Sequence, residues 1–71
     1  MRITYNQRVD AAYVHLTEQR LMQGGDVVPC ALPDGTYGSI YLDFNDGVLI
    51  GIEVLGASAV LPDDVLTVAS A

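Results

Sequence analysis

Four side chains in this sequence could together form a polar site. Glu53 is the most suggestive, because a carboxylate flanked by hydroxyl groups and an imidazole could bind a small ligand or act on it. Histidine is the side chain type that changes charge near neutral pH, which makes His15 a candidate, and Tyr13 and Tyr41 lie in segments that alternate like strands. The candidate binding residues are therefore Tyr13, His15, Tyr41 and Glu53. A lone glutamate has no partner carboxyl of different pKa with which to divide acid and base roles, so we favour an exposed strand carboxylate and expect no catalytic residue.

Neither metal binding nor a reactive thiol is indicated. The single cysteine, Cys30, lies in an apolar run, where a small buried hydrophobic residue is the default interpretation. A metal site needs several His, Cys or carboxylate ligands at motif spacing, and here they are scattered. The segment from Asp43 to Gly47 resembles part of a calcium loop but lacks the bidentate glutamate. We expect no metal and no cofactor.

The charge balance bears on the partners. Nine acidic residues stand against three arginines and no lysine, and the net charge is -6. This charge opposes binding to nucleic acid phosphates and to anionic lipid, so we expect neither partner. The longest apolar stretch, Val48 to Ile52, is too short to span a bilayer. One free cysteine and the lack of an export signal predict a cytoplasmic protein.

Alternating apolar residues predict the elements that position these side chains. Strands are expected at Ile3–Tyr5 and Ala11–Leu16, and a third at Asp26–Leu32, which Pro29 confines to a sheet edge or interrupts. Residues 56–59 look loosely structured. The segment Leu61–Leu66 resembles a helix start, with a proline followed by two acidic residues. The prediction is a mainly β fold: one domain over residues 1–71, an antiparallel β-meander of about five short strands with a short C-terminal helix.

The strongest element signal is a β-hairpin around Asn45, Asp46 and Gly47. Its apolar face comprises Ile40, Leu42, Phe44, Val48, Ile50, Ile52 and Val54. Successive strand residues face opposite sides, so an odd-length loop is needed to bring both arms to one face. We therefore predict a three-residue loop that pairs Phe44 with Val48, Leu42 with Ile50 and Ile40 with Ile52. In this register Glu53 lies opposite Ser39, and Tyr41 lies opposite Gly51.

Two blocks of the sequence resemble a small bacterial family, domain of unknown function 2283. Ile3–Tyr5 followed by Val9–Leu16 is similar to the family pattern I-T-Y-D … A-D-A-L-Y-I-x-L. Ile40–Gly47 and Leu49–Ser58 are similar to I-L-D-Y-D-x-D-G-x-L-V-G-I-E-I-L-x-A-S. The segment from Gly24 to Tyr37 is longer than the family pattern, and the tail lacks its charged helix formers. The resemblance implies a small β-rich fold and brings no established catalytic residue.

Composition favours association over catalysis. With 51% apolar residues in 71, the chain has more apolar surface than a small monomer can bury, and no disulfide can compensate. We predict a non-enzymatic association module, a homodimer through the apolar hairpin face that also binds another protein. One alternative is a small ligand-binding or hydrolytic site at the four candidate residues. The other is an acidic, antitoxin-like partner of a basic protein.

Overall fold

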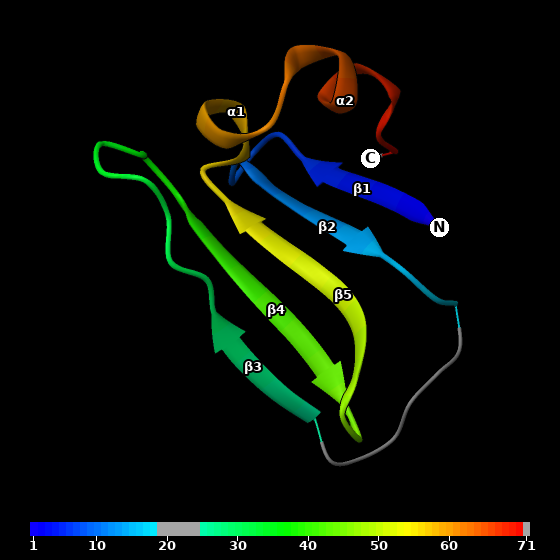
Figure 1. Ribbon diagram of the computed structural model, residues 1–71. Helices are drawn as coiled ribbons and strands as arrows, with labels where there is room; N and C mark the ends of the chain where they lie inside the picture. Colours follow the sequence, from blue (N-terminus) through cyan, green and yellow to red (C-terminus); the bar gives the residue numbers. More distant parts are fainter. Residues whose placement is uncertain (19–24, 71) are drawn as a thin grey trace.

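The computed structural model describes residues 1–18 and 25–70, and within them the chain forms five strands and two short helices (Figure 1). The strands are β1 (Arg2–Asn6), β2 (Ala11–His15), β3 (Gly25–Pro29), β4 (Ser39–Asn45) and β5 (Val48–Leu55). The helices are α1 (Ala57–Val60) and α2 (Asp63–Val68). The mainly β class with a C-terminal helix is confirmed. The prediction missed α1, since it left residues 56–59 loosely structured.

All strand pairs are antiparallel, but the strands are not arranged in sequence order. The order is β1-β2-β5-β4-β3. The central strand β5 therefore pairs with β2 of the β1–β2 hairpin on one side and with β4 on the other. The strand that contains Pro29 lies at the edge, as predicted. The Cys30 N–H donates to the Ile40 carbonyl (2.8 Å), so the nitrogen of the preceding Pro29 points away from β4, where no ladder hydrogen bond is lost.

The hairpin differs from the prediction in its loop and its register. Asp46 and Gly47 have φ values of 53° and 79°, which makes a two-residue type I′ turn that fits the strand twist. A register shift between Asp43 and Phe44 adds one residue, Ile50, to β5. Because the bulge supplies the odd residue, the parity rule holds, although the predicted three-residue loop is wrong.

In the observed register, each β4 residue pairs with a β5 residue that lies one or two positions later than predicted. Ile40 lies opposite Val54, Leu42 opposite Ile52 and Phe44 opposite Leu49, and Tyr41 lies opposite Glu53 rather than Gly51. Val48 pairs with Asn45, so its side chain does not lie on the predicted apolar face. Val48 is 62% exposed.

Alternation divides the sheet into two chemically distinct faces. The apolar face comprises two cross-strand rows, Tyr5, Ala12, Val54 and Ile40, then Ile3, Val14, Ile52, Leu42 and Val28. The polar face comprises Thr4, Tyr13, Glu53 and Tyr41, then Arg2, His15, Gly51, Asp43 and Val27. These two names are kept below.

The core lies at one end of the apolar face. Among the described residues the fully buried apolar ones are Ala12, Val54 and Ala57. Packed against them are Tyr5, Ile40, Ile52, Val60, Leu61 and Leu66. Figure 1 shows α1 and α2 beyond the ends of β1 and β5, away from β3 and from the tip of the β4–β5 hairpin. The helices therefore cover the row that begins with Tyr5 and leave the next row less protected.

The C-terminal tail closes one edge of the sheet. Ser70 makes a parallel bridge with Thr4, and its N–H donates to the Ile3 carbonyl (2.9 Å). The Tyr5 N–H donates in turn to the Ser70 carbonyl (2.6 Å). Two outward backbone groups of β1, the Ile3 carbonyl and the Tyr5 N–H, are thus satisfied within the chain. Among the described helices, none has the length and apolar character that a membrane crossing requires.

Candidate functional site

The polar face brings the four predicted site residues together. Tyr13, Glu53 and Tyr41 form one cross-strand row, with Glu53 on the central strand β5 and a tyrosine on each side. His15 lies in the next row, opposite Gly51. Pairing of β2 with β5 places Tyr13 beside Glu53. That long-range pairing was not predicted.

The Tyr13 ring lies across the sheet, over Gly51. A methyl group at position 51 would overlap the Tyr13 phenol, so only glycine leaves room for the ring. The Tyr13 hydroxyl reaches β4 and donates to Asp43 Oδ2 (2.7 Å), and its ring meets His15 edge-on, with centroids 4.6 Å apart. The hydrogen bond of the hydroxyl and the edge-on contact with His15 therefore hold the ring over Gly51.

This placement sets the protonation of Tyr13. Burial of the phenol, the hydrogen bond to Asp43 and the nearby negative charges raise the pKa of Tyr13 to about 12. The phenol is thus neutral at physiological pH and acts as a hydrogen-bond donor. Asp43 was not a predicted site residue; its spacing of two from Tyr41, on the same face of β4, is the signal that could have found it.

His15 is held by neighbours from β1. Its Nδ1 lies 3.5 Å from Arg2 Nη2, and its Nε2 lies 3.2 Å from Thr4 Oγ1. A guanidinium can only donate, so Nδ1 would be the acceptor in the contact with Arg2, which leaves Nε2 to pair with the threonine hydroxyl.

An ion pair at the surface completes this row. Arg2 donates to both carboxylate oxygens of Glu18 at 3.1 Å, with side chains 47% and 60% exposed. The hydrogen bond from Arg2 lowers the pKa of Glu18, and Glu18 raises the pKa of Arg2. The cation of this row is therefore already paired. Glu53, by contrast, is exposed and accepts no hydrogen bond from any residue in the described part of the chain.

A second polar cluster, which the sequence did not predict, links the β1–β2 turn to α1. The Asp10 carboxylate accepts hydrogen bonds from Tyr5 Oη (2.8 Å), the Ser58 N–H (2.9 Å) and Ser58 Oγ (2.7 Å). The Asp10 carbonyl also accepts from the Ala57 N–H (2.9 Å). The Ser58 hydroxyl, followed by Tyr5 and the Ser58 N–H, lowers the pKa of Asp10. Because Ala57 and Ser58 belong to α1, these hydrogen bonds attach α1 to the β1–β2 turn.

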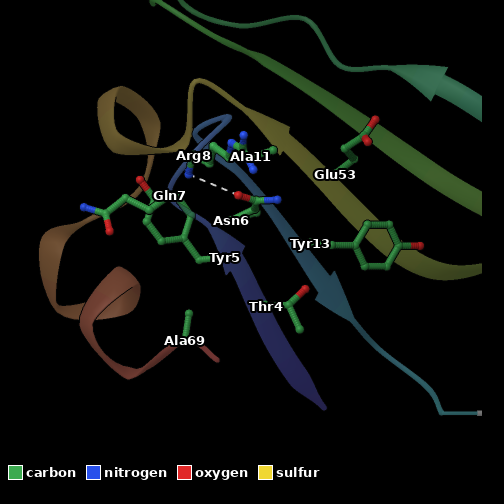
Figure 2. A pocket seen from close by; sticks show the side chains of 10 residues that line it. Thr4, Tyr5, Asn6, Gln7, Arg8, Ala11, Tyr13, Glu53 and Ala69 are labelled. Carbon is green, nitrogen blue, oxygen red and sulfur yellow. Dashed lines mark hydrogen bonds between the residues drawn. The ribbon is translucent and has the colours of Figure 1, made fainter. Parts of the chain in front are cut away.

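An open hollow lies at the β1–β2 turn, beside the polar face. Figure 2 shows Tyr13 and Glu53 on one side, and Asn6 at the end of β1 with Gln7 and Arg8 of the turn on the other. Asn6 Oδ1 accepts from the Arg8 backbone N–H (3.0 Å), which shapes the turn. Of the predicted site residues, Tyr13 and Glu53 line this hollow.

Other candidate groups remain apart from the site. Cys30 is exposed, so its interpretation as a buried hydrophobic residue is wrong: it follows the edge strand β3, whose residues are all exposed. Within residues 1–18 and 25–70, no three His, Cys, Asp or Glu residues converge as metal ligands would.

A family model matches residues 2–58, and its description reads "Protein of unknown function (DUF2283)". The match spans β1 to β5 and the first two residues of α1, so it includes the polar face and both Asp10 and Ser58. No curated protein and no solved structure matches the chain.

Proposed function

We propose that this chain, which belongs to the DUF2283 family, is a non-enzymatic domain that associates with a second copy of itself through the apolar face. The observation that carries this proposal is the position of the helices. They pack over one end of the apolar face and lie away from β3 (Figure 1), and among the described residues of the row from Ile3 to Val28 only Ile52 packs against the core cluster.

The side chains of that row support an interface. None of them is fully buried: Ile3, Val14, Ile52 and Leu42 are half-buried, and Val28 is 44% exposed. Phe44 at the hairpin end is also half-buried. Removing one large apolar side chain from water stabilises by about 1.5–3 kcal/mol. A partner that covered this row would therefore contribute much of what a domain of this size lacks.

The edges of the sheet favour packing of faces over extension of the sheet. The edge at β1 is occupied by Ser70 of the same chain. At the other edge, β3 is short, and Pro29 has no N–H at an outward position. Proline on an edge strand opposes pairing with another strand. Two copies would therefore meet face to face.

One further feature supports association over catalysis, and another supports a location in the cytoplasm. The Tyr13 hydroxyl donates its proton to Asp43, and the pKa of Tyr13 is raised to about 12, so this phenol is not poised as a base. The exposed Cys30 thiol suits a reducing compartment, where free thiols persist.

Light scattering after gel filtration tests the proposal with a matched pair of variants. Val27 and Val28 are neighbours on β3, but Val28 is on the apolar face and Val27 on the polar face. We expect a dimer for the native chain and for Val27→Glu, and a monomer for Val28→Glu. A native chain that is monomeric at concentrations of tens of micromolar, or two variants that dissociate alike, would contradict the proposal.

A further inference from the structure

We infer that the polar face is a docking surface for a basic segment of a partner protein, whose arginine or lysine side chain binds between Tyr13 and Tyr41 and pairs with Glu53. This surface is on the opposite side of the sheet from the proposed dimer interface. Both can therefore be occupied at once, and the inference does not rest on dimerisation.

The first support is the fixed aromatic ring. Tyr13 lies over Gly51, with its hydroxyl bound to Asp43 and its edge against His15. A ring held in this way loses little conformational entropy when a ligand arrives. Figure 2 shows it extending from β2 across β5. Tyrosine faces attract cations, and an arginine guanidinium also stacks on them.

The second support is an unpaired carboxylate at the centre of the same row. Glu53 is exposed, sits opposite both Tyr13 and Tyr41, and accepts no hydrogen bond from the described residues. A guanidinium or ammonium bound against Tyr13 would be near this carboxylate, because Tyr13 and Glu53 are cross-strand neighbours that line the same hollow. A charge-assisted hydrogen bond of that kind is about twice as strong as a neutral one.

The charges on and around the polar face favour a cationic ligand. Asp43 adds a second carboxylate two residues from Tyr41, whereas the nearby cation Arg2 is already paired with Glu18. Arg8 of the β1–β2 turn lines the hollow across from Glu53 but forms no ion pair with it among the described residues. The whole chain carries a net charge of -6, which attracts a basic partner from a distance. At the β3 end of the face, Val27 is 63% exposed and offers apolar contact to the rest of an extended segment.

Fluorescence anisotropy with a labelled synthetic peptide of alternating arginine and glycine tests this inference. We expect saturable binding that weakens with added salt, and no binding of the matching glutamate–glycine peptide. Glu53→Gln should weaken binding by about tenfold, as expected for loss of one charged contact. Asp64→Asn removes the same charge from α2, outside the polar face, and should leave affinity nearly unchanged.

The outcomes separate specific docking from general attraction. Equal weakening by Glu53→Gln and Asp64→Asn would show that only net charge matters and would overturn the inference. Arginine amide that binds as tightly as the peptide would overturn docking of an extended segment. Tyr41→Leu should also weaken binding, and melting curves of each variant confirm that it folds. Val28→Glu should bind the peptide normally, so a failure of dimerisation and a failure of peptide docking are distinguishable.

Discussion

Gly51 has no Cβ, and this leaves room for the Tyr13 ring to lie across the polar face. A Cβ there would overlap the Tyr13 phenol, which Asp43 and His15 hold in place. We expect Gly51→Ala to destabilise the fold by about 1–3 kcal/mol, as overpacking does. In a Tyr13→Ala background the same change should be neutral or slightly stabilising, because alanine loses less backbone entropy on folding than glycine. Urea unfolding of the four chains measures the coupling, and an equal cost in both backgrounds would show that the ring does not restrict position 51.

The Asp10 carboxyl makes the folding stability depend on pH. Hydrogen bonds from Ser58 and Tyr5 lower the pKa of its carboxyl in the folded state. Its stabilising effect is therefore complete above the ordinary aspartate pKa and is lost as pH falls through the lower folded value. Asp10→Asn keeps a residue that tolerates the φ of 54° but removes the charge.

Melting temperatures between neutral and strongly acidic pH test this expectation. The native chain should lose more stability on acidification than Asp10→Asn does, because the variant has already lost this charged acceptor. Asp34→Asn, in the exposed turn before β4, is the matched control and should follow the native curve. Parallel acid curves for the native chain and Asp10→Asn would contradict the assignment.

At the scale of elements, the β4–β5 hairpin depends on its turn. Gly47 has a φ of 79°, which a β-branched residue adopts only under strain. Gly47→Val should destabilise the fold by about 1–3 kcal/mol. Gly47→Asn should cost less, because asparagine enters the left-handed region more readily. Denaturant midpoints of the two variants rank the costs, and equal midpoints would argue against a type I′ turn.

For the whole molecule, the proposed dimer couples stability to concentration. A partner that binds only the folded state stabilises it by mass action. The melting temperature of the native chain should therefore rise by several degrees as its concentration rises from about 1 to 100 µM. Val28→Glu should melt at a temperature that does not change with concentration. A native melting temperature independent of concentration would count against the interface on the apolar face.

Local pattern was sufficient to predict much of this fold. Alternation in Ile40–Phe44 and Val48–Val54 predicts strands, and the parity rule correctly requires one odd residue in the hairpin. Pro29 marks an edge strand because it lacks a hydrogen-bond donor, and the two acids after Pro62 mark a helix because they suit its N-terminal dipole. Each of these rules depends on neighbours in sequence, so the sequence by itself determined the strands, the start of α2 and the face that most strand side chains occupy, but not α1.

Tertiary pairing decided which side chains meet. A period of two assigns a residue to a face but not to a partner, so the pattern alone could not tell a bulge at Ile50 from a longer loop. The insertion of β5 between β2 and β4 places Tyr13 over Gly51 and Glu53 between two tyrosines. The contacts of Asp10 with Ser58, and of Ser70 with β1, join residues far apart in the chain. Contacts of this kind depend on how the whole sheet and both helices pack, which local periodicity does not encode.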